Sequence, residues 1–183
     1  MSGPDICPFT AADLCGAASA GGALLALNNA NARALSWLDP ERLAALAGQA
    51  FLALRIVNGD GFLLAFDQDA DYDSPNFLWF RGRYERFVYI DRVVVATPAR
   101  GRGYARRLYD VLFRHACDSG HELVVCEVNS HPPNPVSDAF HAALGFVEIG
   151  AGVIHGGGKT VKYLSRRCAV PAAGSPASRT PPP

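Results

Sequence analysis

The stretch RFVYIDRVVVATPARGRGYARRL, residues 86–108, decides the fold. Residues 86–96 are mostly apolar and β-branched, which predicts a long strand buried in a sheet. Pro98 interrupts that pattern, and an apolar stripe with helical spacing starts at Ala105. A helix that begins directly after a glycine-bearing turn points free backbone N–H groups outward, where they attract anions. The stretch therefore predicts a buried strand, a turn suited to phosphate, and a helix.

Strand and helix signals on both sides of this stretch predict a mixed α/β domain around a central sheet. Asn58-Gly59 lies between two apolar runs, which indicates a β-hairpin. Asp39 and Pro40 are typical of the N-cap and first position of a helix. Residues 67–76 are rich in aspartate and turn formers, and we expect a loop there. Further helices are expected from Thr10 onward and at 137–146, and further strands at 122–129, 146–154 and 160–164.

The composition predicts one globular domain. The chain has 183 residues, 49% of them hydrophobic, and its 17 acidic residues balance its 17 lysines and arginines. A neutral total argues against a dedicated nucleic-acid-binding protein. The five cysteines include no CxxC pair, which argues against a zinc site or a disulfide framework and fits a reducing cytoplasm. We expect a cytoplasmic protein that needs no metal.

The two ends of the chain predict neither a membrane segment nor a second domain. The first basic residue is Arg33, so the early apolar run lacks the positive start of a signal peptide. No apolar run is long enough to span a bilayer. Residues 1–168 are expected to form the domain. Residues 169–183 are rich in proline, alanine and serine without apolar periodicity, and we expect a disordered tail.

A second glycine-rich stretch, HGGGKT at residues 155–160, competes for the role of phosphate loop. A Walker A loop needs its first glycine five positions before the glycine of Gly-Lys-Thr. Counting back from Gly158, that position is Val153. The segment that follows is expected to be a strand, which supplies no helix N-terminus for a phosphate. The stretch therefore predicts a hairpin turn.

Residues 99–105 resemble motif A of the GNAT acetyltransferase superfamily. That motif has arginine or glutamine, two residues, glycine, one residue, and glycine or alanine, and here Arg100, Gly103 and Ala105 hold those positions. The resemblance extends over about residues 50–165. It implies the GNAT fold, an α/β fold whose mostly antiparallel sheet is flanked by helices and whose fourth and fifth strands splay apart.

A second motif downstream resembles the same family. The family has an asparagine, a small residue, a tyrosine and a Gly-Phe pair at fixed spacing. In this chain those positions are held by Asn134, Ser137, His141, Gly145 and Phe146. The chain departs from the family pattern at His141, where relatives usually have tyrosine.

The resemblance implies an N-acetyltransferase that uses acetyl-CoA. Acetyl would pass to a primary amine of a small molecule or peptide by direct attack in a ternary complex. In the family, backbone amides of motif A bind the pyrophosphate, the fourth strand binds the pantetheine arm and polarises the thioester, and the asparagine contacts the arm. The implied cofactor-binding residues are Val93, Val94, Val95, Arg100, Gly101, Arg102, Gly103, Tyr104, Ala105 and Asn134. Read from the residues alone, the valines are also ordinary sheet core and the asparagine an N-cap.

The resemblance also implies a base and an acid. Asp91 lies four residues before Val95, where many relatives have a glutamate, and on a strand it shares a face with Tyr89 and Val93. It would take the proton of the attacking amine; the alternative is an ion pair with a nearby arginine. His141 would protonate the departing thiolate; the alternative is a helix histidine at the surface or against the sheet.

Acceptor residues are not given by the motifs. In this fold the acceptor usually lies opposite CoA, beside the N-terminal helices and loops. The aspartates at 67, 69, 71 and 73 would favour a cationic one; the alternative is a solvated acidic loop. A calcium loop is not expected there, because Tyr72 and Leu78 hold positions that need glycine and glutamate. A non-catalytic acyl-CoA sensor remains the alternative function, and a homodimer is compatible with the sequence. The candidate acceptor-binding residues are Asn28, Asn29, Tyr72, Asn76, Trp79 and Tyr84.

Overall fold

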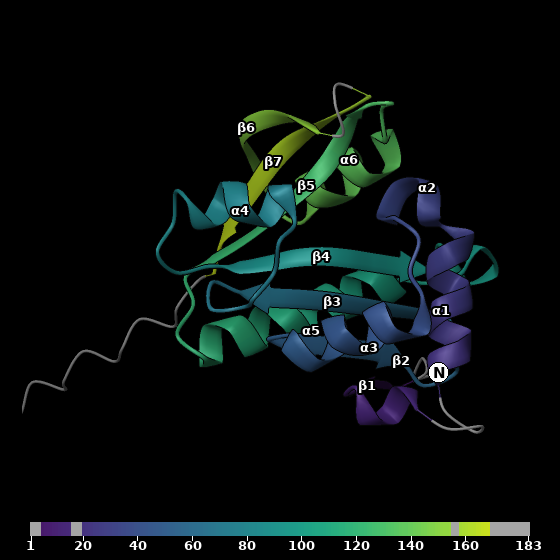
Figure 1. The fold of residues 1–183 in the computed structure, drawn as a ribbon. Helices are drawn as coiled ribbons and strands as arrows, with labels where there is room; N and C mark the ends of the chain where they lie inside the picture. Colours follow the sequence, from purple (N-terminus) through teal and green to yellow (C-terminus); the bar gives the residue numbers. More distant parts are fainter. Residues whose placement is uncertain (1–4, 16–19, 155–157, 169–183) are drawn as a thin grey trace, which may run out of the picture.

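The computed structural model describes residues 5–15, 20–154 and 158–168, which fold around one sheet (Figure 1). Its strand order is β1-β2-β3-β4-β5-β7-β6. Neighbouring strands are antiparallel except β4 and β5, as expected for this fold. The strands are β1 (Ile6–Pro8), β2 (Leu52–Ile56), β3 (Gly61–Asp67), β4 (Val88–Val95), β5 (Leu123–His131), β6 (Val147–Ile154) and β7 (Lys159–Arg167).

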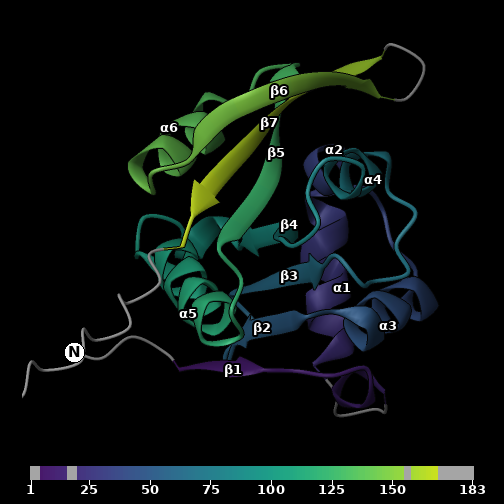
Figure 2. The same ribbon diagram turned by 90° about the vertical axis from the view of Figure 1, so that its left-hand side faces the viewer.

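Helices cover both faces of the sheet (Figure 2). One buried cluster joins α1, α3 and α4 to one face, and a second joins α5 to the other, so each face has its own core. Short 3-10 turns lie at Ala12–Leu14 and Thr97–Ala99. The α-helices are α1 (Gly21–Ala30), α2 (Ala32–Leu35), α3 (Pro40–Gln49), α4 (Pro75–Arg81), α5 (Tyr104–Asp118) and α6 (Pro135–Ala143).

Local sequence signals account for most of these elements. β2 and β3 form the hairpin predicted around Asn58-Gly59. Asp39 caps α3 by accepting a hydrogen bond of 2.6 Å from the Arg42 backbone N–H. The prediction of a loop over residues 67–76 is wrong at its end, because α4 begins at Pro75. The predicted tail, residues 169–183, lies outside the described residues.

The fourth and fifth strands separate after a short contact. β4 and β5 pair only at Val88↔Val124 and Tyr89↔Val125. Beyond that point β5 continues beside β7, while β4 stays paired with β3. In Figure 2 the two strands diverge, which confirms the predicted splay. Within the described chain, the edge of β4 that faces β5 therefore has no strand partner beyond Tyr89.

β4 contains a bulge at Asp91. Leu64 on β3 pairs with Arg92 and Ala65 pairs with Ile90, so Asp91 is an extra residue between them. The prediction that Asp91 shares a face with both Tyr89 and Val93 is therefore wrong. Tyr89 belongs to the cluster under α1 and α3, whereas Val93 packs against the cluster under α5. The bulge turns the Asp91 and Arg92 side chains toward each other.

Candidate active site

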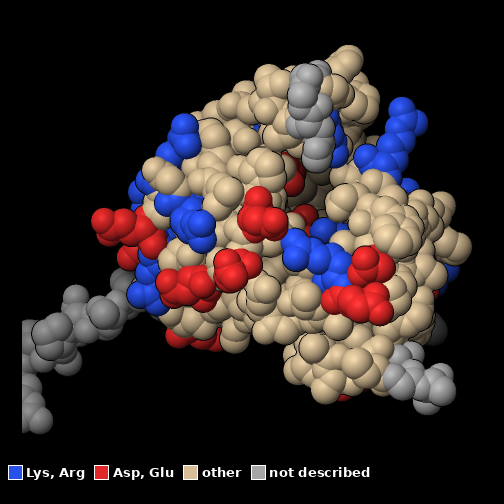
Figure 3. Space-filling model, viewed as in Figure 1, with Lys and Arg blue, Asp and Glu red and all other residues tan. Residues whose placement is uncertain are grey.

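A cavity of about 1080 Å³ occupies the gap between β4 and β5. It runs from the N-terminus of α5, past the open edge of β4, to the loops before α3 and α4. In Figure 3 the molecule is hollowed on this face, and both acidic and basic atoms are visible in the hollow. One continuous cavity therefore joins the predicted phosphate loop to the region where an acceptor is expected.

The phosphate end of the cavity is formed by the turn before α5. Gly101 and Gly103 both have φ of +77°, a conformation that side-chain-bearing residues rarely adopt. A Cβ atom at either position would meet open space, so the backbone conformation and not packing requires glycine there. Gly103 is the N-cap of α5, and the free N–H groups of the first turn lie beside the cavity.

Most of the predicted cofactor-binding residues line this cavity. The Arg100 guanidinium is held by hydrogen bonds of 3.2 Å to the Val95 carbonyl and 3.1 Å to the Asn31 side chain. Arg102 is not among the lining residues, whereas Arg106 is. The predicted residues that line the cavity are Val93, Val94, Val95, Arg100, Gly101, Gly103, Tyr104, Ala105 and Asn134.

Glu127 is the main residue that the sequence interpretation missed. It lies on β5 and lines the cavity opposite the open edge of β4. Its Oε2 atom is buried and has no hydrogen-bond partner in the described chain. Burial and the negative charge of Asp91 raise the pKa of Glu127 to about 7, although hydrogen bonding with Tyr89 and Asn76 opposes the shift. A carboxyl group with this pKa can accept a proton near neutral pH.

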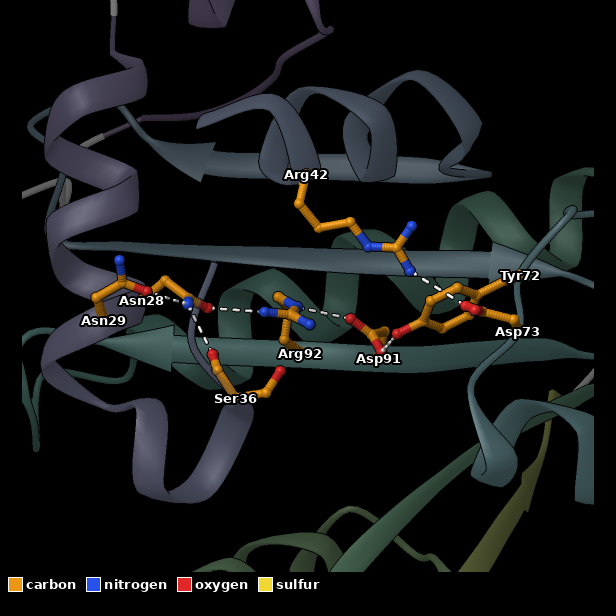
Figure 4. Close-up of polar contacts among 8 residues, drawn as sticks. All are labelled: Asn28, Asn29, Ser36, Arg42, Tyr72, Asp73, Asp91 and Arg92. Carbon is orange, nitrogen blue, oxygen red and sulfur yellow. Dashed lines mark hydrogen bonds and ion pairs between the residues drawn. The ribbon is translucent and has the colours of Figure 1, made fainter. Parts of the chain in front are cut away.

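Asp91 is half of a buried ion pair (Figure 4). Its Oδ2 atom accepts a 2.6 Å hydrogen bond from Arg92 Nε, and its Oδ1 atom accepts one of 2.6 Å from the Tyr72 hydroxyl. Burial disfavours the charged guanidinium, but the adjacent carboxylate outweighs burial and raises the pKa of Arg92. The alternative of an ion pair is therefore what the structure shows, and both carboxylate oxygens are already engaged.

His141 is buried against α5 at the cavity wall. Its Nδ1 atom lies 2.8 Å from the Ser137 carbonyl, which can only accept, so Nδ1 carries the proton. Its Nε2 atom then accepts a 2.8 Å hydrogen bond from the Tyr109 hydroxyl. Burial lowers the pKa of His141. Asn134 caps α6 through a 3.1 Å bond from the Ser137 N–H and lines the cavity as well, so both interpretations of this residue are compatible.

The predicted acceptor-binding residues divide into two groups. Tyr72 and Asn76 line the cavity. The other four, Asn28, Asn29, Trp79 and Tyr84, do not. Asn29 instead holds the backbone of Leu38 with bonds of 2.8 and 2.9 Å. Trp79 stacks on Tyr163 with ring centroids 4.0 Å apart. Tyr84 packs against the core under α4.

The two other sequence features lie largely away from the cavity. Of the four aspartates in the 67–73 segment, only Asp73 lines it, and its carboxylate pairs with Arg42 at 3.2 Å. The aspartates at 67, 69 and 71 lie outside the cavity lining. Residues 155–157 of HGGGKT lie outside the described residues, and the segment that follows is β7, as predicted, and not a helix.

Two general properties hold over the described residues. No helix there is long and apolar enough to cross a membrane. No group of three histidine, cysteine, aspartate or glutamate side chains is arranged there to hold a metal ion.

A helix N-terminus at one end of the gap can bind a phosphate-bearing co-substrate, and the unpartnered carboxylate oxygen of Glu127 inside the gap can accept a proton. Residues 58–146 match the model of the Acetyltransferase (GNAT) family. The chain therefore contains a GNAT acetyltransferase domain over these residues and has the fold of that family. A comparison with curated protein sequences finds no match.

Several solved structures share this fold. The yncA protein of Salmonella typhimurium, solved with its cofactor acetyl-CoA, is 19% identical over 97% of this chain and 99% of that one, with a TM-score of 0.65. A phosphinothricin acetyltransferase of Sinorhizobium meliloti, in complex with acetyl-CoA, is 17% identical over 98% and 96%, with a TM-score of 0.64. A ribosomal-protein-alanine N-acetyltransferase of Brucella melitensis is 23% identical over 88% and 98%, with a TM-score of 0.63. At these identities the likeness concerns the fold.

Proposed function

We propose that this protein is a cytoplasmic N-acetyltransferase that binds acetyl-CoA and an amine together and transfers acetyl directly to the amine. The observation that carries this proposal is the single cavity that joins the α5 N-terminus to Glu127. Two of the structural neighbours were solved with acetyl-CoA, which supports the same co-substrate here. The named acceptors of the neighbours, phosphinothricin and a ribosomal-protein alanine, are both amines.

The co-substrate would occupy the half of the cavity bounded by α5 and β4. The N–H groups around Gly101 and Gly103 would bind the pyrophosphate, with Arg100 and Arg106 adding positive charge. The pantetheine arm would pair with the free edge of β4 at Val93–Val95, as a peptide pairs with an open sheet edge. A backbone N–H on that edge would also stabilise the oxyanion of the tetrahedral intermediate.

Glu127 is the better candidate for the base. An amine attacks the thioester only when it is neutral, so a group near it must accept a proton. Asp91 already accepts hydrogen bonds at both oxygens, whereas Oε2 of Glu127 accepts none in the described chain. We assign proton removal to Glu127. Asp91, the base inferred from the sequence, would instead raise the Glu127 pKa and hold Arg92.

The acid would be the hydrogen-bonded pair of His141 and Tyr109. As the neutral tautomer described above, His141 has no proton on Nε2 to give. A ring that takes up a proton from solvent would donate Nε2–H to the Tyr109 oxygen, and the tyrosine hydroxyl proton would then pass to the departing thiolate. Histidine thus keeps the role implied by the family resemblance, but acts through a tyrosine on another helix.

Release of free thiol from acetyl-CoA, followed across a panel of primary amines, tests the proposal. Acceptor-dependent release that is abolished by Glu127→Gln is the expected result. The alternative function, an acyl-CoA sensor without turnover, predicts tight CoA binding by calorimetry and no acceptor-dependent release. That outcome would refute the proposed activity while leaving the binding site in place.

A further inference from the structure

We propose that the acceptor is an amine that also carries a carboxylate, and that Arg92 binds this carboxylate at the acceptor end of the cavity. This inference rests on the proposed function and names its substrate class. Arg92 is only 4% exposed, yet it lines the cavity. A buried arginine on the wall of a binding cavity is suited to an anionic group, because its planar guanidinium matches a carboxylate.

The guanidinium retains donors for a ligand. Of its five N–H groups, Nε–H is used by Asp91 and one N–H of Nη1 by the Asn28 side chain, at 2.6 and 2.8 Å (Figure 4). Up to three N–H groups are therefore left for a molecule in the cavity, although the Tyr72 hydroxyl also lies close to the guanidinium. Asp91 balances much of the guanidinium charge, but it cannot turn to cover the remaining donors, because the Tyr72 hydroxyl fixes its second oxygen.

The support behind Arg92 is strained, which indicates a functional role for its position. Asn28, fully buried, accepts from Arg92 and donates a 3.0 Å hydrogen bond to the Ser36 carbonyl. Ser36 has φ of 94° and ψ of 148°, a conformation normally restricted to glycine. It is the only residue other than glycine with positive φ in the described ranges, and it lines the cavity. Strain of this kind persists where neighbouring contacts enforce it, and here those contacts orient Arg92.

The charged side chains in the cavity fit a molecule that carries both a positive and a negative group. Near the acceptor end, the unpartnered Glu127 oxygen suits an ammonium or amine, and Arg92 suits an anion. Arg42, which could compete for the anion, is exposed and already paired with Asp73. Because Asp91 lies close to both Glu127 and Arg92, the two binding groups are neighbours in one cavity. A small amino acid likewise presents an amine and a carboxylate close to each other.

Matched acceptors test the proposal. Amino acids of increasing amine–carboxylate spacing are compared with their carboxamides and with the amines that lack the carboxylate, by thiol release. We expect the acids to have kcat/KM at least about tenfold higher, as a charge-assisted hydrogen bond to a buried arginine gives. A carboxamide of an α-amino acid has the less basic amine and so more of its neutral form, which biases the comparison against the proposal. Equal kcat/KM for acid, carboxamide and plain amine would overturn it while leaving the acetyltransferase activity established.

Arg92→Lys keeps the charge and removes the guanidinium fork, so it should reduce the acid-to-carboxamide ratio to near one. Arg81→Lys, an exposed arginine outside the cavity, is the matched control and should keep the ratio. If Arg92→Lys does not fold, calorimetric titration of the acid and its carboxamide into the wild-type protein with CoA present gives a binding readout that needs no turnover. Tighter binding of the acid supports the proposal, and equal or absent binding of the acid refutes it.

Discussion

The Tyr109 hydroxyl lies 2.8 Å from Nε2 of His141, and both side chains line the cavity between β4 and β5. The two residues come from α5 and α6, which approach each other only in the folded protein. The Ser137 carbonyl on the other side of the ring fixes the tautomer. This chain has His141 at the position where relatives usually have tyrosine, but His141 is hydrogen-bonded to the hydroxyl of another tyrosine, Tyr109.

If Tyr109 and His141 pass the same proton to the thiolate, removing either one breaks the same step. The losses of turnover in the two single variants should therefore not multiply in the double variant. His141→Phe should lower turnover by about a hundredfold, and Tyr109→Phe by at least about tenfold. The double variant should be no more than about twofold worse than the poorer single variant. Single-turnover rates measure this, with CoA affinity as the control for binding. Multiplicative losses would show that the two side chains act independently.

Glu127→Gln should remove the acidic limb of the pH–rate profile. In the wild type, kcat/KM should rise as pH increases through about 7, because the raised pKa leaves Glu127 protonated and inactive at lower pH. The glutamine variant should lose on the order of a hundredfold in turnover and show no such limb. Its affinity for CoA should be unchanged. A limb that persists in this variant would assign the base to another group, with Asp91→Asn the next variant to measure.

Gly103→Glu should weaken CoA binding by at least about a hundredfold, on the order of 3 kcal/mol. The side chain would place a negative charge where the pyrophosphate is expected and would strain the positive φ. Gly103→Ala adds the strain without the charge and is the matched control. Calorimetric titration gives both affinities, and circular dichroism checks the fold. If the folded glutamate variant bound CoA as tightly as the wild type, the phosphate would have to bind elsewhere.

His121 should make the fold sensitive to mild acid. It is buried, contacts Phe51 edge to face with ring centroids 5.0 Å apart, and has no hydrogen-bond partner in the described chain for either ring nitrogen. Burial, with the nearby positive Arg86, lowers its pKa below the ordinary 6.5. As pH falls below about 6.5, the unfolded chain takes up a proton that the folded one resists, so the free energy of unfolding should fall.

His121→Phe isolates this contribution. The variant keeps the ring contact with Phe51 but cannot be protonated, so its melting temperature should change less between neutral and mildly acidic pH. His141, whose pKa is also lowered, is present in both proteins and cancels in the comparison. Parallel pH dependence of the two melting temperatures would show that His121 contributes nothing.

The sequence predicted the elements that depend on local signals. The Asn58-Gly59 hairpin, the N-cap of α3, β4 and α5 follow from turn chemistry, capping and apolar periodicity. The prediction of a loop over residues 67–76 was wrong at its end, where α4 begins. It gave more weight to the aspartates of this segment than to Pro75, although proline is a good first residue for a helix. The splay of β4 and β5 came from the family resemblance, since no local pattern encodes two strands that part.

The acceptor end of the site was less predictable, because it depends on contacts between distant segments. The bulge at Asp91 arises from the register with β3. Because of it, the residues after Asp91 face the side of the sheet opposite to the one that strict alternation predicts. Asn28 reaches Arg92 across 64 positions in the chain. Glu127 could have been found from the sequence. It is an ionisable residue inside the apolar run LVVCEV, as Asp91 is in VYIDRVVV, and burying such a residue is costly unless it has a partner or a function.

The unpaired edge of β4 links the supply of co-substrate to the lifetime of the protein. If acetyl-CoA fills that edge, it is a temporary eighth strand, and its departure exposes backbone groups and cavity wall to water. Binding at a hundred times the dissociation constant would add about 2.7 kcal/mol to the free energy of unfolding. The enzyme would then resist proteolysis best when acetyl-CoA is plentiful, so metabolic state would set its abundance as well as its rate.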